Sequence, residues 1–282
     1  MLGKLIKYDL KSMLRTMFPL WIALFIASIL FGIRSAIFHP GSEAILDSSE
    51  ADAIQMLMFV ILFGVGVAVF VLNIIVIIQR FWHGLLKDEG YLMFTLPVSV
   101  RQLILSKAIS AFILSLLSLL VALVCFLLII AASILASLKG QVPYLWYIDV
   151  WRELKSALVQ AFGRNPAAFA GWTIYWIIAG ATDLLGDIYQ AYAAMAIGQL
   201  SNKNRFISSI IAYIGISIVL STIVAIPLVG LGQLGGFGFV HFFDTEAITT
   251  TVMIIGLVVN ILQLIAFHII TEFILRNNLN LE

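Results

Sequence analysis

IQMLMFVILFGVGVAVFVLNIIVII, residues Ile54 to Ile78, decides the fold because it contains no charged side chain. A helix crosses the hydrocarbon core of a bilayer in roughly 20 residues, so an apolar run of this length is a candidate span. Backbone groups in lipid must be satisfied internally, which leaves only helices and closed barrels. The run lacks the alternation of a barrel strand, and it therefore indicates a transmembrane helix.

Five further apolar runs share this character. They are Phe18 to Phe38, Ser106 to Leu138, Pro166 to Leu200, Phe206 to Leu231 and Thr249 to Leu275. The sequence therefore predicts an all-α polytopic membrane protein whose six transmembrane helices occupy residues 18–282. The first run has no small-residue cleavage pattern after a short apolar core, so we expect a retained anchor and not a signal peptide.

Composition supports the same class. Of 282 residues, 62% are hydrophobic and 11% charged, whereas soluble proteins contain roughly 45–50% apolar and about 25% charged residues. A soluble fold and a disordered chain are both excluded. The net charge of +1 gives no footprint for nucleic acid, and the single cysteine, Cys125, excludes a disulfide framework.

Basic residues set the expected orientation. Eleven of the sixteen Lys and Arg residues lie in the segments on the side of the termini, four lie on the other side, and Arg34 lies within the first run. The positive-inside rule then places both termini in the cytoplasm. Residues 1–17 carry apolar and basic residues on opposite helical faces, which predicts an interfacial helix on the inner leaflet.

The segment between the second and third runs, residues 79–105, is longer than a helix turn requires. Its mixture of aromatic and charged residues is typical of a binding patch, and an amphipathic elbow against the bilayer is an equally good interpretation. Pro97, followed by a capping box from Ser99 to Gln102, predicts that the third helix begins near Val100.

Two segments are expected on the external side. Residues 139–165 should form a small helical cap with a helix from Asp149 to Phe162, and Pro166 should start the next span. The glycine-rich residues 230–248 predict an irregular or re-entrant external loop.

Catalytic chemistry is not indicated by any motif. The chain contains no GxxxxGK[ST], GxSxG or HExxH pattern, so we expect neither catalytic residues nor a metal site. His268 and Glu272 lie one helical turn apart, but two ligands do not make a metal site. Asp183 and Asp187 share one helix face within a span and are candidates for lining a substrate path. We expect a structural or solvated role for Asp183 and leave the path-lining role open for Asp187.

The central segment also resembles a known family. DEGYLMFTLPVSVRQLILSK, Asp88 to Lys107, is similar to the DEGYLTFTLPVS...LLLSK signature of bacterial membrane subunits of type-2 ATP-binding-cassette (ABC) exporters. KYDLKSMLR at Lys7 to Arg15 and AIGQLSNKNR at Ala196 to Arg205 are weaker echoes. The sequence departs from the pattern at Met93, at Val100 with Arg101, and in its larger external segment between the third and fourth runs.

This resemblance implies a multi-pass permease subunit of the bacterial plasma membrane without ATPase activity of its own. Two permease subunits, identical or homologous, would pair with two cytosolic ATP-binding subunits, which would hold the ATP and Mg. The resemblance makes residues 79–105 a coupling loop that docks on the ATPase. The expected contacts are Lys87, Asp88, Glu89, Gly90, Tyr91 and Phe94.

Other functions stay open. An ion-coupled secondary transporter would use Asp183 or Asp187, an intramembrane hydrolase would need paired catalytic groups on facing helices, and an immunity or sensor subunit would bind a peptide without moving it. For an exporter, the resemblance favours a peptide or another amphiphile as substrate.

Overall fold

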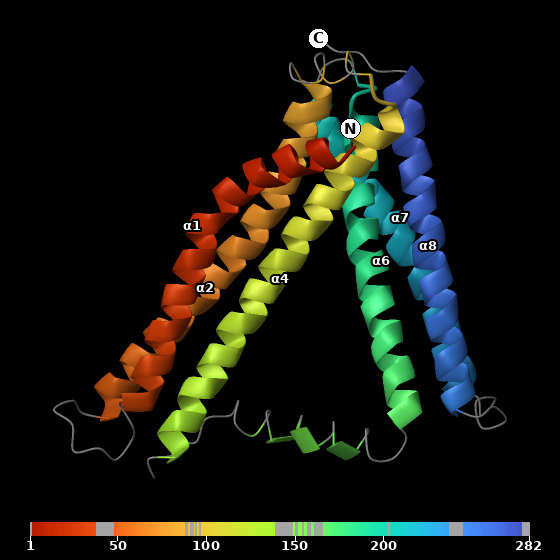
Figure 1. Cartoon of the computed structure of the whole chain (residues 1–282). Helices are drawn as coiled ribbons and strands as arrows, with labels where there is room; N and C mark the ends of the chain where they lie inside the picture. The colour runs from red at the N-terminus through yellow and green to blue at the C-terminus, as the bar shows by residue number, and fades with distance from the viewer. Residues whose placement is uncertain are drawn as a thin grey trace. The chain divides into compact units, whose positions relative to one another are not determined.

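The computed structural model describes residues 2–37, 48–87, 90, 93, 95, 97–138, 149, 152–153, 155–156, 159–160, 166–201, 204–236 and 245–277. Within these ranges the chain is all-helical and contains no strand, which confirms the predicted class (Figure 1). The elements are α1 (Leu2–Ile37), α2 (Ser48–Phe81), the π-helical turn η1 (Trp82–Leu86), α4 (Val100–Leu138), α6 (Pro166–Gly198), α7 (Arg205–Gly236) and α8 (Thr245–Asn277).

Each of the six apolar runs corresponds to one long helix. Within the described residues, α1, α2, α4, α7 and α8 each contain a stretch that is long and apolar enough to cross a membrane. Helix α6 is not among these five; it carries Asp183, Asp187 and Gln190 together with several Trp and Tyr residues. The chain thus has the character of a multi-pass membrane protein.

Two helix starts confirm the sequence signals. Helix α4 begins at Val100, directly after Ser99, whose Oγ accepts a hydrogen bond of 3.4 Å from the Gln102 backbone N–H. Helix α6 begins at Pro166, a residue whose missing N–H costs nothing in a first helical turn.

The N-terminal region differs from the expected two-part arrangement. Helix α1 is continuous from Leu2 to Ile37 and contains Pro19, so the amphipathic segment and the first apolar run belong to one bent helix (Figure 1). A helix of this length rises about 54 Å, well beyond a hydrocarbon core of roughly 30 Å. The placement of residues 1–17 on the inner leaflet stays a prediction.

The predicted external segments have mixed outcomes. The described residues between 149 and 160 are helical, and Arg152 forms an ion pair with Asp149 at 3.5 Å. Helix α7 continues through Gly230, Gly232 and Gly235 to Gly236, where a loop was expected, and α8 begins at Thr245. Glycine is tolerated in an apolar helix because helical hydrogen bonds are the best way to satisfy a backbone away from water. Residues 237–244 lie outside the described part of the chain.

The chain divides into two compact units. The N-terminal unit contains residues 7–77 and 113–173, and the C-terminal unit contains residues 1–6, 78–112 and 174–282. Each unit has its own set of contacts.

In the N-terminal unit, polar side chains join α1, α2 and α4. Trp21 Nε1 donates to Ser118 Oγ at 3.2 Å, Ser118 Oγ donates to Asn73 Oδ1 at 3.3 Å, and Asn73 Nδ2 donates to Ser115 Oγ at 3.1 Å. Such bonds hold helices together in lipid, where apolar packing alone gives little preference for a neighbouring helix over lipid. Leu24, Val69 and Cys125, one from each of these helices, also form a buried apolar cluster.

In the C-terminal unit, contacts define how α6 lies beside α7 and α8. Tyr175 Oη donates to the Met253 carbonyl at 3.1 Å, and further along both helices the Tyr189 ring packs against His268 at 5.3 Å. Residue numbers rise together along this pair, so α6 and α8 run parallel. Gln190 Nε2 donates to Ser217 Oγ at 2.7 Å.

Helices α6 and α7 also meet at a very close contact. A Cβ built on Gly198 would lie 2.6 Å from the backbone nitrogen of Ser209 and 2.7 Å from its Cα. Because Gly198 follows Gln190 along α6 while Ser209 precedes Ser217 along α7, these two helices are antiparallel. Only glycine allows this close approach of the end of α6 to the start of α7.

Candidate partner-docking site

Buried side chains of the C-terminal unit gather around the segment that joins α2 to α4. Side chains are buried in η1, in the first turns of α4, in the last part of α6 and in the last turns of α8. Examples are Leu85, Ile104, Tyr192 and Leu275. Most side chains in the candidate membrane spans of α7 (Arg205–Ile223) and α8 (Met253–Asn277) are, in contrast, not buried. The joining segment therefore begins and ends where side chains of α4, α6 and α8 are buried together.

The segment begins with an aromatic contact. Phe81, the last residue of α2, stacks on Tyr192 of α6 with ring centroids 4.0 Å apart and an interplanar angle of 16°. Both side chains are at most 1% exposed. Trp82 then meets Phe206 of α7 edge to face at 5.8 Å. Two rings in succession thus fix the exit of the chain from α2.

The π-helical turn η1 is held by buried side chains and by the side chain of Lys107. Gly84, Leu85 and Leu86 are buried in succession, and a Cβ on Gly84 would lie 2.8 Å from Lys107 Nζ. Lys107 is only 2% exposed. Lys107 is one of the basic residues on the side of the termini, and its side chain packs against the turn.

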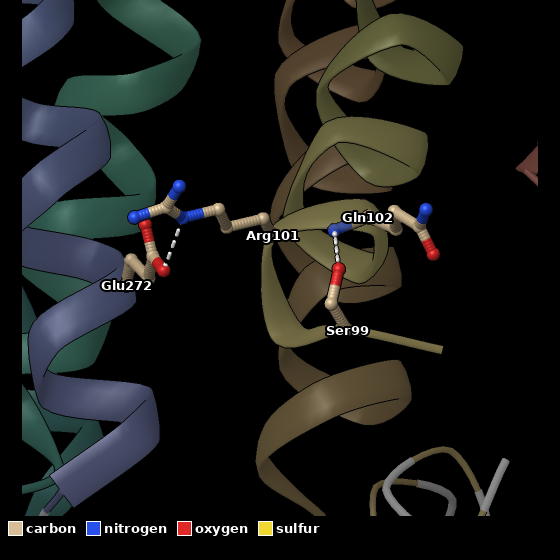
Figure 2. A network of polar contacts seen from close by, with 4 residues as sticks. All are labelled: Ser99, Arg101, Gln102 and Glu272. Carbon is tan, nitrogen blue, oxygen red and sulfur yellow. Dashed lines mark hydrogen bonds and ion pairs between the residues drawn. The ribbon is translucent and has the colours of Figure 1, made fainter. Parts of the chain in front are cut away.

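The segment ends at a second anchor, drawn in Figure 2. Ser99 caps α4, and the Gln102 side chain points away from it, so only the serine half of the expected capping box forms. Arg101 extends to the opposite side, where its Nε donates to Glu272 Oε1 of α8 at 2.5 Å. Val100 and Arg101 are positions at which the sequence departs from the family pattern, and Arg101 has a defined partner here.

Of the six expected docking residues, the structure describes Lys87 and Gly90. Lys87 is exposed, and Gly90 is buried, with its N–H donating to the Lys87 carbonyl at 2.7 Å. The turn therefore presents the Lys87 side chain outward while Gly90 sits inside. Asp88, Glu89, Tyr91 and Phe94 lie outside the described residues.

The path-lining candidates are not part of this site. Asp183 and Asp187 are exposed on α6, before the buried stretch that begins at Ile188. A carboxylate exposed on a helix of a membrane protein requires water or a partner beside it.

Metal ligation finds no support in the described residues, because they contain no group of three or more His, Cys, Asp or Glu side chains placed to hold an ion. Glu272 is engaged with Arg101, and His268 packs against Tyr189.

Several residues that build the site were not singled out from the sequence. Tyr192, Gly198 and Ser209 belong to helices whose apolar composition does not reveal which face meets a neighbour. Gly198 lies within AIGQLSNKNR, the weaker echo of the family, and the close approach to Ser209 gives that glycine a physical reason.

Comparison of the chain with protein-family models, with curated proteins and with solved structures finds no match.

Proposed function

We propose that this chain is the permease subunit of a bacterial ABC exporter. Six spans with both termini in the cytoplasm would form half of the membrane path, and a second permease subunit, identical or homologous, would form the rest. Two separate ATP-binding subunits would hydrolyse ATP with Mg, and the substrate would be a peptide or another amphiphile moved out of the cell. The observation that carries the proposal is the DEGYLMFTLPVSVRQLILSK segment.

The contacts around that segment support a docking role. Its base is fixed by buried residues such as Phe81 and Leu85, while Lys87, Pro97 and Ser99 are exposed in the single chain. A fixed base with an exposed rim is what a docking element needs, because a force applied by a partner then reaches the helices and does not dissipate in a loose loop.

The mechanism follows from this anchoring. ATP binding would draw the two ATP-binding subunits together and would move the docked segments with them, and packed helices would reorient as rigid bodies. Nucleotide can shift the conformation only if the ATP-binding subunit contacts the two conformations differently at this segment.

The test replaces Asp88, Glu89 and Tyr91 with alanine. We expect the triple variant to lose copurification of the ATP-binding subunit, identified by mass spectrometry through its Walker motifs, or to lose ATP-driven transport. The matched control replaces Arg152, Glu153 and Lys155, which are exposed in the segment between α4 and α6, and it should retain both. Normal assembly and normal transport in the docking variant would refute the proposal.

An ion-coupled secondary transporter is the main alternative, with Asp183 and Asp187 as the coupling site. In proteoliposomes it would work without a second subunit, would be abolished by ionophores, and would fail in the Asp187→Asn variant. An immunity or sensor subunit would bind a peptide and show no transport in the same assay.

A further inference from the structure

The docking segment is the stretch of residues 79–105 that joins α2 to α4. Its first part is connected to α8 by a series of aromatic rings in contact. Phe81 stacks on Tyr192, Tyr192 packs edge to face on Tyr189 at 6.2 Å, and Tyr189 packs on His268 of α8 at 5.3 Å. Phe81, Tyr192 and Tyr189 are each less than 5% exposed. Close-packed rings have no free volume into which one can move without displacing the next.

The trailing end of the segment reaches α8 through the ion pair between Arg101 and Glu272. Charge-assisted hydrogen bonds are short and directional, and this pair fixes where the start of α4 lies along α8. His268 and Glu272 are four residues apart, so they lie on one face of the same helical turn. Both ends of the docking segment therefore reach one turn of α8.

We propose that the His268 to Glu272 turn of α8 is where movement of the docking segment enters the last helix, with Arg101 and Glu272 as positioning residues. The inference rests on the proposed permease function. Two attachments to one turn constrain its orientation as well as its distance, so a shift of the segment turns α8 along with it. The Arg101 side chain is 68% exposed, and exposed ion pairs add little to stability, so removing this pair should leave the fold intact.

The experiment uses the complex of the full chain with its ATP-binding subunit in lipid nanodiscs. An environment-sensitive fluorophore on a cysteine at Ile265, an exposed position of α8, reports the response to Mg-ATP. The native Cys125 is buried, so the chain without the added cysteine serves as the labelling control. The variants are Arg101→Glu, Glu272→Arg and the two combined, and Arg276→Glu on the next turn of α8 is the matched control.

We expect each single reversal to reduce the ATP-induced fluorescence change about five-fold or more, the lower end of the coupling typical between linked sites. The double reversal should restore the change because it re-forms the pair with the charges exchanged, and Arg276→Glu should keep it. Binding of the ATP-binding subunit should be the same for Glu272→Arg and Arg276→Glu as for the unmodified chain, a result that a general loss of structure would not give.

Two results would overturn the inference. The first is a full response in both single reversals, and the second is a double reversal as impaired as the singles. Failure of the proposed function has a different signature, because the unmodified chain would then bind no ATP-binding subunit at all. If the complex hydrolyses ATP but the fluorophore on α8 shows no change, the proposed role of α8 would be refuted and the proposed permease function would not.

Discussion

The helices within each unit are joined by contacts of different kinds, and these contacts lie at different places along the helices. In the N-terminal unit, α1, α2 and α4 are joined by hydrogen bonds among Trp21, Ser118, Asn73 and Ser115, away from the helix ends. In the C-terminal unit, ring stacking, a glycine contact and an ion pair gather where the helices meet the docking segment.

Burial also varies along the helices of both units. Most helix surface in either unit is exposed in the single chain, as lipid-facing and partner-facing surface must be. Where α2, α4, α6 and α8 meet the segment that joins α2 to α4, side chains such as Phe81, Leu85 and Ile104 are almost fully buried.

The largest effect, and so the strongest test of this comparison between the two units, is expected for the Phe81→Ala variant. Removing a fully buried ring that stacks on Tyr192 leaves a cavity and should lower the free energy of unfolding by about 3–5 kcal/mol. Phe70→Ala is the control, because Phe70 is 67% exposed on the same helix in the N-terminal unit. Titration with a denaturing detergent measures both, and equal losses would show that the region around Phe81 is not specially packed.

The next effect is expected at Gly198. A methyl group there would meet the backbone of Ser209, which cannot move aside as a flexible side chain could. We expect Gly198→Ala to cost about 1–3 kcal/mol by overpacking. Gly215→Ala on α7 has open space around its Cβ and should be neutral or slightly stabilising, since alanine favours a helix by about 0.5–1 kcal/mol over glycine. If both variants unfold alike, α6 and α7 do not approach as described.

A smaller effect tests the polar contacts of the N-terminal unit. Asn73→Leu removes the link between Ser118 and Ser115, and we expect a loss of about 1 kcal/mol, because side-chain hydrogen bonds in membrane proteins average about 0.6 and reach about 1.7 kcal/mol. Ser221→Ala removes a bond within α7 only and serves as the control. A loss at Asn73 no larger than at Ser221 would mean that these bonds do not hold the helices together.

The smallest effect concerns the start of α4. Ser99→Ala should destabilise by about 0.5 kcal/mol, the low end for an N-cap, because the hydrogen bond to Gln102 is long at 3.4 Å. Ser99→Thr should retain the cap. Amide hydrogen exchange of the first turn of α4 is the sensitive measurement. Unchanged exchange in the alanine variant would show that Ser99 does not stabilise the start of this helix.

Local signals predicted the helices well. Uninterrupted apolar runs, such as Ile54 to Ile78, each correspond to a helix, and the signals at Ser99 and Pro166 predicted where two helices begin. These signals act within one or two turns of the chain. The expected loop from Gly230 onward was wrong in extent, because α7 continues to Gly236 and a helix in apolar surroundings tolerates glycines that would interrupt it in water.

Contacts between helices were not predictable in the same way. In lipid, the faces that meet another helix and the faces that meet lipid are equally apolar, so periodicity does not reveal which face is buried. Asn73 was a usable signal, as an isolated amide in an apolar run, and it does join helices. The pairing of Arg101 with Glu272 joins residues far apart in the sequence, and no local rule connects them.

The π-helical turn at the end of α2 sets the direction in which the chain leaves that helix. A π-turn holds about one residue more than an α-turn, so the following side chains are rotated by roughly 100° relative to an uninterrupted helix. In this turn three consecutive residues, Gly84, Leu85 and Leu86, are buried, and the next residue, Lys87, is exposed. The angular setting of the exposed lysine is therefore determined by a single additional residue of winding.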